Sequence, residues 1–166
     1  MRSPDSLPET EARLTEGERR EILGELSHYP NRKAASIDAL KIVQRRLGWV
    51  PDATLAEVAA LLGMTAEELD SVATFYNLIY RRRVGRHVIL LCDSISCWVV
   101  GYDAVRQALE ATLGIGFGET TPDGRFTLLP ICCLGACDKA PVLLIDEDRH
   151  ELVDAASLTG ILQRYE

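Results

Sequence analysis

Five cysteines are the residues of this sequence whose type and spacing could support chemistry. They all lie between positions 92 and 137 of a chain of 166 residues. Four of them form two spaced pairs, Cys92 with Cys97 and Cys133 with Cys137, and Cys132 is the fifth. A thiolate can act as a redox nucleophile or as a ligand of zinc or of an iron–sulfur cluster. Because the number is odd and no apolar signal segment begins the sequence, we do not expect a framework of disulfides.

The spacing within the pairs favours a cluster of two irons over a single zinc ion. Structural zinc sites commonly use two cysteines separated by two residues, whereas here the gaps contain four and three residues. Wider gaps let the chain wrap around a larger group, and a two-iron cluster with one cysteine pair on each iron meets that demand. Gly135 and Ala136, between the last two cysteines, leave room for backbone N–H groups to approach sulfur. Zinc and thiol redox chemistry stay as alternatives, as do inert packed thiols.

The elements around the cysteines indicate how two distant pairs can meet. Residues 87–92 form a nearly continuous apolar run, which predicts a buried strand that ends at the first cysteine. A helix over about 102–113 and a second strand over 125–131 should follow, and this order favours a parallel pair of strands. Parallel strands end at the same edge of a sheet. We therefore expect the loop that contains Cys97 to converge there with the loop that contains the last cysteine pair.

The end of the sequence predicts a hairpin and a last helix. Apolar segments over 142–146 and 150–153 should add antiparallel strands to the parallel pair. Asp154 is expected to cap a final helix with an apolar stripe. A mixed sheet with this order of elements fits a thioredoxin-like domain over residues 86–166.

Residues 15–85 have the apolar period of helices and predict a small helical bundle. Thr15 with Glu18, and Thr65 with Glu68, have the spacing of capping boxes that begin helices. Glycines after the second and third apolar stripes are expected to end those helices.

Two further segments flank the bundle in this interpretation. Residues 1–14 contain few apolar side chains and predict a mobile tail. The basic segment from Arg81 to Gly85 predicts a hinge whose arginines could dock on an acidic partner. The fold class is therefore expected to be α+β or α/β, with an N-terminal helical bundle followed by a thioredoxin-like domain with a mixed sheet.

The distribution of charge excludes some classes of partner. The formal net charge is −7, and the part from Arg86 onward contains twelve acidic and six basic side chains. Affinity for phosphate comes mainly from Lys and Arg, so we expect no nucleic-acid binding. Residues 55–69 resemble a helix-turn-helix, but Glu67, Glu68 and Asp70 would face phosphates with the wrong sign.

Two other functions are not expected from the sequence. No strictly apolar run exceeds five residues, whereas a helix that spans a membrane needs about 20. We therefore expect no direct insertion into a membrane.

No glycine-rich dinucleotide fingerprint follows a predicted strand, so we expect neither an NAD site nor a catalytic residue on this chain.

Two cysteine-bearing segments resemble the thioredoxin-like [2Fe–2S] ferredoxin family. They are CDSISCWVVGYDAV at 92–105 and DGRFTLLPICCLGACDKAPVLLIDED at 123–148. More narrowly, these segments resemble the E-subunit family of bacterial NADH:quinone oxidoreductases (respiratory complex I), as do LGWVPDATLAEVAALLGM at 47–64 and SVATFYNLIYRRRVGRHVI at 71–89. The resemblance extends over about residues 15–166.

The resemblance implies one [2Fe–2S] cluster held by Cys92, Cys97, Cys133 and Cys137. The first pair would bind one iron and the second pair the other. Cys132 would then be a packed or neighbouring thiol. The resemblance also implies an electron-transfer role in which the cluster exchanges single electrons with the FMN of a partner that binds NADH, so hydride chemistry would occur on that partner.

The same resemblance implies partners and a location. The chain would dock against the flavin- and NADH-binding subunit and a neighbouring iron–sulfur subunit of the peripheral arm, with the helices of residues 15–85 helping to attach it. The complex would lie on the cytoplasmic side of the inner membrane. An equivalent subunit of an NAD-linked hydrogenase or formate dehydrogenase is the alternative, and so is a zinc-binding or thiol-redox thioredoxin-like protein. Negative charge on the thiolates and on residues 86–166 predicts a low reduction potential.

Overall fold

The computed structural model describes residues 13–165, which form two compact units. The first unit ends at Arg83 and the second begins at Val84, and each is described by itself. The described part of the first unit contains helices without a sheet, and the second combines helices with a mixed sheet. The predicted α+β class is therefore confirmed.

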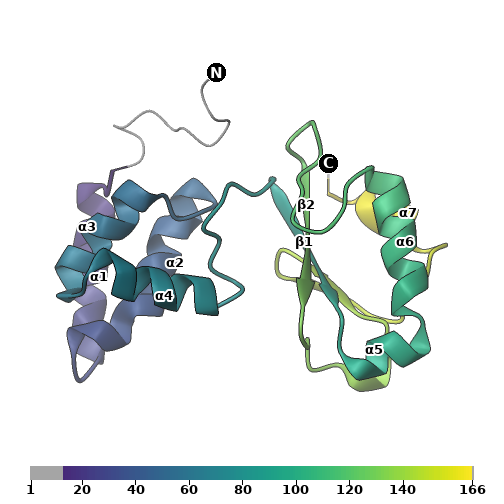
Figure 1. Cartoon of the computed structure of the whole chain (residues 1–166), viewed down its shortest axis with the longest axis horizontal. Helices are drawn as coiled ribbons and strands as arrows, with labels where there is room; N and C mark the ends of the chain where they lie inside the picture. Colours follow the sequence, from purple (N-terminus) through teal and green to yellow (C-terminus); the bar gives the residue numbers. More distant parts are fainter. Residues whose placement is uncertain (1–12, 166) are drawn as a thin grey trace. The chain divides into compact units, whose positions relative to one another are not determined.

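Four α-helices make up the described part of the first unit (Figure 1): α1 (Glu16–Glu25), α2 (Ser36–Leu47), α3 (Asp52–Leu62) and α4 (Ala66–Phe75). Short 3₁₀ turns at Leu26–His28 and Arg32–Ala35 connect α1 to α2. Both predicted capping boxes are present at the starts of α1 and α4, and left-handed glycines end α2 and α3 as expected. The apolar faces of the helices pack into one core.

The predicted tail over residues 1–14 lies outside the described residues, except for its last two. Arg13 forms an ion pair with the carboxylate of Glu57 at 2.9 Å. The backbone N–H of Leu14 donates to the same carboxylate at 3.0 Å. Both residues therefore contact Glu57 of α3 at the end of the predicted tail.

A buried carboxylate joins α1 to α2. Glu18 is 8% exposed, and it accepts hydrogen bonds from Arg46 Nε at 2.7 Å and Arg46 Nη2 at 3.0 Å. Burial raises the pKa of Glu18, but the bonds from Arg46 and Thr15 outweigh it and leave this pKa below its ordinary value. The same carboxylate completes the capping box, so the start of α1 and its attachment to α2 depend on one charged group.

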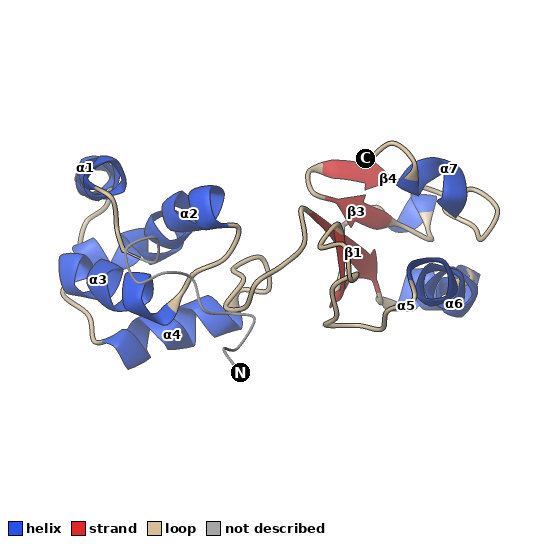
Figure 2. Cartoon of the chain, turned by 90° about the horizontal axis from the view of Figure 1, so that it is seen from above, coloured by secondary structure: helices blue, strands red, loops and turns tan. Residues whose placement is uncertain are grey.

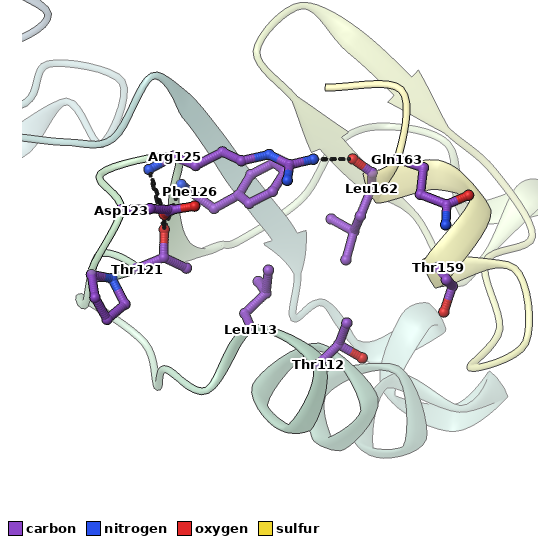
Figure 3. Close-up of a pocket in the computed structure, with 10 residues that line it drawn as sticks. Thr112, Leu113, Thr121, Asp123, Arg125, Phe126, Thr159, Leu162 and Gln163 are labelled. Atoms are coloured by element: carbon purple, nitrogen blue, oxygen red, sulfur yellow. Dashed lines mark hydrogen bonds between the residues drawn. The ribbon is translucent and has the colours of Figure 1, made fainter. Parts of the chain in front are cut away.

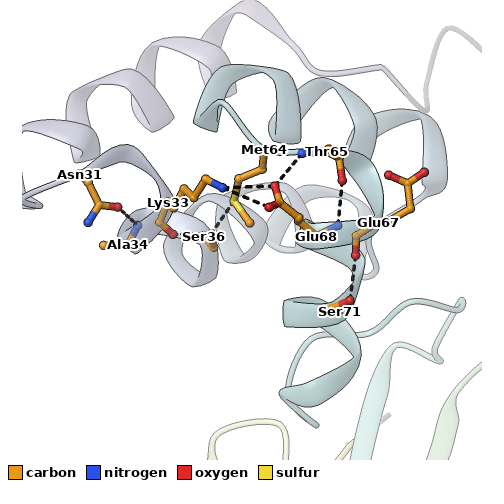
Figure 4. A network of polar contacts seen from close by, with 9 residues as sticks. All are labelled: Asn31, Lys33, Ala34, Ser36, Met64, Thr65, Glu67, Glu68 and Ser71. Atoms are coloured by element: carbon orange, nitrogen blue, oxygen red, sulfur yellow. Dashed lines mark hydrogen bonds and ion pairs between the residues drawn. The ribbon is translucent and has the colours of Figure 1, made fainter.

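A second polar network joins the start of α4 to the segment before α2 (Figure 4). Lys33 Nζ lies 3.2 Å from the carboxylate of Glu68, which also accepts the Thr65 N–H at 3.0 Å. The Ser36 hydroxyl donates to the Lys33 carbonyl at 2.5 Å and lies 3.3 Å from the sulfur of Met64. Glu68, one of the acids that argued against DNA binding, thus helps to hold the helices together.

The described part of the second unit contains a four-stranded sheet in the order β2–β1–β3–β4. Its strands are β1 (His87–Cys92), β2 (Phe126–Ile131), β3 (Leu143–Ile145) and β4 (Asp148–His150). β1 pairs in parallel with β2 and antiparallel with β3, which pairs antiparallel with β4. The helices α5 (Ile95–Val100), α6 (Tyr102–Leu113) and α7 (Leu158–Leu162) lie on one side of the sheet (Figure 2). The predicted mixed sheet, a parallel pair with a terminal hairpin, is confirmed.

The last strand of the hairpin begins earlier than predicted. β4 covers residues 148–150 instead of 150–153, because the chain turns at Asp146 and Glu147. Asp146 has a φ of +54°, and its carboxylate accepts the Val88 N–H at 3.0 Å. This bond holds the early turn against β1.

The final helix is shorter than predicted. α7 begins at Leu158, and its N-cap residue is Ser157. Asp154 accepts the Ser157 N–H at 2.8 Å and so closes the turn before the helix. Asp154 therefore stabilises the approach to α7 and does not cap the helix itself.

The segment predicted as a basic hinge, residues 81–85, is attached to the fold at both ends. Arg81 Nε lies 2.6 Å from the carboxylate of Asp70, and Arg81 Nη2 lies 2.5 Å from that of Asp52. At the other end, the Gly85 N–H donates to the hydroxyl of Thr127 at 2.6 Å. The charge of Arg81 is thus paired within the helical unit.

Candidate metal centre

The two cysteine-bearing segments meet at one edge of the sheet, as the topology predicted. In the parallel register of β1 and β2, Cys92 is paired with Ile131, the last residue of β2. The Asp93 N–H donates to the Ile131 carbonyl at 3.0 Å, so the two strands end together. The loop after β2 and the helix after β1 therefore lie at the same end of the sheet (Figure 1).

Cys97 lies in helix α5 and not in a loop, which corrects the prediction. Residues 95–100 form this short helix, and Ser94 is its N-cap residue. Cys97 is the buried residue of α5, and its other apolar residues face away from the core. Six residues with one buried position are too few for periodicity to reveal a helix.

The first cysteine pair is buried. Cys92 and Cys97 are 3% and 2% exposed. Burial raises the pKa of Cys97 to about 11, and the neighbouring sulfurs of Cys92 and Cys137 act in the same direction. A thiolate at Cys97 therefore needs a cation beside it, and a bound metal supplies one.

The second pair lies in the exposed loop after β2, where the environment has the opposite effect. The Gly135 N–H donates to the Cys133 sulfur at 3.4 Å, and this bond lowers the pKa of Cys133. Hydrogen bonds with Cys137, Ser94 and Cys92 act in the same direction. Gly135 has a φ of +72°, which glycine adopts at little cost, so this residue allows the loop to aim its N–H at sulfur.

The four sulfurs of the two pairs influence one another. The pKa of Cys97 responds to Cys92 and Cys137, and that of Cys133 responds to the same two residues. Within residues 13–165, no group of three or more His, Cys, Asp or Glu side chains is gathered tightly enough to hold a metal ion. Two converging pairs of thiols fit a group with more than one metal atom, each of which binds cysteine sulfur, as in a two-iron cluster. The assignment of these four residues as ligands stays a prediction.

Cys132 contacts this site through its backbone. The Cys132 carbonyl accepts a long hydrogen bond from the Cys92 sulfur at 4.0 Å, whereas the Cys132 residue as a whole is exposed. Cys132 is therefore not packed in the core, and its role as a neighbouring thiol that does not bind metal stays a prediction.

A separate hollow lies toward the beginning of β2 (Figure 3). It measures about 410 Å³ and is bordered by α6, the turn at 121–125 and α7. The Arg125 guanidinium lies 4.7 Å from the centre of the Phe126 ring, and it donates to the carbonyls of Tyr165 at 2.7 Å and Leu162 at 3.0 Å. Arg125 thus satisfies carbonyls at the end of α7 and anchors that helix to the sheet.

Comparison with known proteins identifies relatives over nearly the whole chain. Residues 22–166 match the family model described as thioredoxin-like [2Fe–2S] ferredoxin. The sequence is 51% identical over 159 residues to the E subunit of NADH-quinone oxidoreductase from Escherichia coli strain K12, with 95% of this chain and 96% of that protein covered. It is 50% identical over 152 residues to the protein of the same name from Pseudomonas aeruginosa, with 92% of each covered.

Solved structures contain a similar fold within longer chains. The crystal structure of an NAD+-reducing [NiFe]-hydrogenase in its air-oxidized state matches 67% of this chain, with 26% identity and a TM-score of 0.59. A structure of such a hydrogenase in the H2-reduced state matches 79% of this chain, with 24% identity and a TM-score of 0.68. The match covers 19% and 22% of the two hydrogenase chains.

Proposed function

Because this chain belongs to the thioredoxin-like [2Fe–2S] ferredoxin family, we propose that it is the electron-transferring E subunit of an NADH–quinone oxidoreductase, respiratory complex I. Two relatives of that name match it at 50% and 51% identity over more than nine-tenths of both chains. The observation that carries the proposal is the meeting of two cysteine-bearing segments at one edge of the parallel strands. The chain is thus a subunit of an oxidoreductase, and no catalytic residue is assigned to it.

Cys92 and Cys97 would hold one iron of a single [2Fe–2S] cluster, and Cys133 and Cys137 would hold the other. When bound, such a cluster accepts and returns one electron at a time. The buried pair would attach it to β1 and α5, and the exposed loop would hold its other side. The Gly135 N–H stabilises negative charge on the Cys133 sulfur.

The proposed electron partner is the FMN of a neighbouring subunit that binds NADH. Hydride chemistry would occur on that subunit, and this chain would exchange single electrons with the flavin. The assembled complex would lie on the cytoplasmic side of the inner membrane. No helix within residues 13–165 has the length and apolar character needed to span a membrane.

The helical unit would attach the chain to neighbouring subunits of the peripheral arm, including an iron–sulfur subunit. Exposed apolar side chains at and after the end of α4 support this role. Phe75 is 80% exposed, Tyr76 is 43% exposed and Leu78 is 42% exposed. Large apolar side chains that gather on a surface commonly mark a contact with another protein.

An equivalent subunit of an NAD-linked hydrogenase is the second candidate. Its support is the similarity to the air-oxidized hydrogenase at 26% identity over 67% of this chain. The E subunits of NADH-quinone oxidoreductases are about twice as similar in sequence and match nearly end to end, which favours the first candidate.

Anaerobic purification of the full chain tests the proposal. We expect a red-brown protein with about two irons and two sulfides per chain, and a paramagnetic resonance signal that appears only after reduction with dithionite. Serine variants of Cys92, Cys97, Cys133 and Cys137 should each lose or alter these spectra, and Cys132→Ser should retain them. A colourless protein with one tightly bound zinc would refute electron transfer. A colourless protein without metal would favour thiol redox chemistry.

A further inference from the structure

Helix α5 exposes apolar side chains beside the cysteine edge of the sheet. Ile95 is 68% exposed, Trp98 is 58%, Val99 is 71% and Val100 is 58%. Cys97, on the same helix, is 2% exposed, so α5 buries its cysteine and turns four large apolar side chains toward water. We call these four residues the α5 patch. Neighbouring apolar side chains at such exposure mark a surface for interaction.

The α5 patch lies close to the proposed cluster ligands. Cys97 belongs to α5, and the loop with Cys133 and Cys137 follows β2 at the same edge of the sheet. Leu152, which is 64% exposed, adds an apolar side chain next to this loop, because its N–H donates to the Lys139 carbonyl at 2.8 Å. A partner that covers the α5 patch would therefore bring its own redox group close to the cysteines.

Acidic side chains accompany the α5 patch. Asp93 lies between β1 and α5, Asp138 lies in the cysteine loop, and both are exposed. Lys139 is the basic residue beside them. The ion pairs found in the described part of this unit use other acids, namely Asp146, Glu110 and Glu151. A partner with cations around an apolar centre would complement this surface. In a dimer of this chain, by contrast, the same acidic side chains would face and repel each other.

We propose that the α5 patch is the docking face for the electron-exchanging partner, a protein surface with an apolar centre and a basic rim. The inference rests on the proposed function, because it requires an electron to reach the cysteine edge from another protein. Trp98 would insert into an apolar pocket of the partner, and Asp93 and Asp138 would pair with its cations. Contact at α5 keeps the two redox groups near each other, as electron transfer between proteins requires.

Binding of the full chain to the purified NADH-binding flavoprotein of the same complex tests the inference. The test variant combines Trp98→Ser with Val99→Ser, because both side chains are exposed and their loss removes no core packing. Leu23→Ser is the matched control, since Leu23 is an apolar residue of α1 that is 45% exposed. We expect at least about a tenfold loss of affinity for the double variant and none for the control, with unchanged visible spectra in both. Asp93→Asn with Asp138→Asn should weaken the dependence of association on salt.

Four other outcomes would each contradict a defined part of the reasoning. Equal affinity of the double variant and the natural chain, with the cluster intact, would overturn the docking role. Loss of the cluster spectrum in the double variant would overturn it too, because the patch would then serve the cluster site itself. A natural chain that dimerises, with a monomeric double variant that still binds the flavoprotein normally, would assign the patch to a second copy. A natural chain that carries its cluster but does not bind the flavoprotein would refute the proposed function, and the inference would fall with it.

Discussion

Gly135 offers a direct test of how the backbone affects the cysteine site. Its φ of +72° lies in the left-handed region, and its N–H donates to the Cys133 sulfur at 3.4 Å. In a Gly135→Ala variant, the new Cβ would have no heavy atom within 4 Å beyond the chain neighbours, so no clash complicates the change. The substitution therefore acts through backbone conformation.

The size of the effect follows from two competing free energies. A left-handed alanine costs about 1–2 kcal/mol, whereas the net contribution of a hydrogen bond such as the one to Cys133 is about 0.5–1.5 kcal/mol. Because the cost of the left-handed conformation is comparable to the contribution of the bond, we expect the exposed loop to rotate toward an unstrained conformation and to weaken or release the bond to the Cys133 sulfur. A one-electron potential changes by about 59 mV per 1.36 kcal/mol, so loss of this bond to a negatively charged sulfur should lower the midpoint potential by up to about 60 mV.

A potentiometric titration of the cluster-containing protein, followed by visible absorption, measures this shift. Gly48→Ala is the matched control, because Gly48 has a φ of +76°, has open space around its Cβ position and ends α2 in the helical unit. Both variants should lose stability in urea, whereas only Gly135→Ala should lower the potential. Equal potentials in the two variants, or a shift to higher potential, would refute the role assigned to the Gly135 N–H.

Three further expectations concern thiol reactivity and stability. In the metal-free chain at about pH 8, iodoacetamide should modify Cys133 before Cys97. The reason is that the Gly135 N–H lowers the pKa of Cys133, whereas burial raises the pKa of Cys97 to about 11. Peptide mass spectrometry at successive times gives the order in which the two cysteines are modified. Arg46→Ala should lower the free energy of unfolding in urea by about 1–3 kcal/mol, because Glu18 stays buried without that partner. The pKa of Glu18 is lowered in the folded chain, so the ionised carboxylate should contribute fully to stability at pH values above 4.5, the ordinary pKa of a glutamate. This contribution should decline as the pH falls through the lowered pKa of the folded chain. Urea unfolding measured between about pH 5 and pH 3 would reveal the decline.

The parts of the fold that could be predicted depend on local signals. The apolar run at 87–92 coincides with β1, and the capping boxes at Thr15 and Thr65 begin α1 and α4. The meeting of the cysteine-bearing segments followed from connectivity, because a strand, a helix and a second strand favour a parallel pair. The spacing of the cysteines and the predicted connectivity were therefore together enough to propose a site, without knowledge of any distant contact.

The parts that could not be predicted depend on contacts between residues far apart in sequence or on very short elements. β4 begins early because the Asp146 carboxylate binds the Val88 N–H, which lies on another strand. Arg81, expected in a hinge, instead pairs with Asp70 and Asp52 of the helical unit. The different burial of the two cysteine pairs was also not visible in the sequence, because it depends on Cys97 lying in the six-residue helix α5.

The register that brings the cysteine pairs together is fixed at the opposite end of the strands. The Gly85 N–H donates to the Thr127 hydroxyl at 2.6 Å, and the His87 N–H donates to the Arg125 carbonyl at 2.8 Å. A Cβ at Gly85 would lie 2.9 Å from the Arg125 carbonyl oxygen, so a glycine is required for this close approach. A slip of β1 by one residue would turn the Cys92 side chain to the other face of the sheet. The geometry of the candidate metal centre therefore depends on contacts at the far end of β1, where none of the proposed ligands lies.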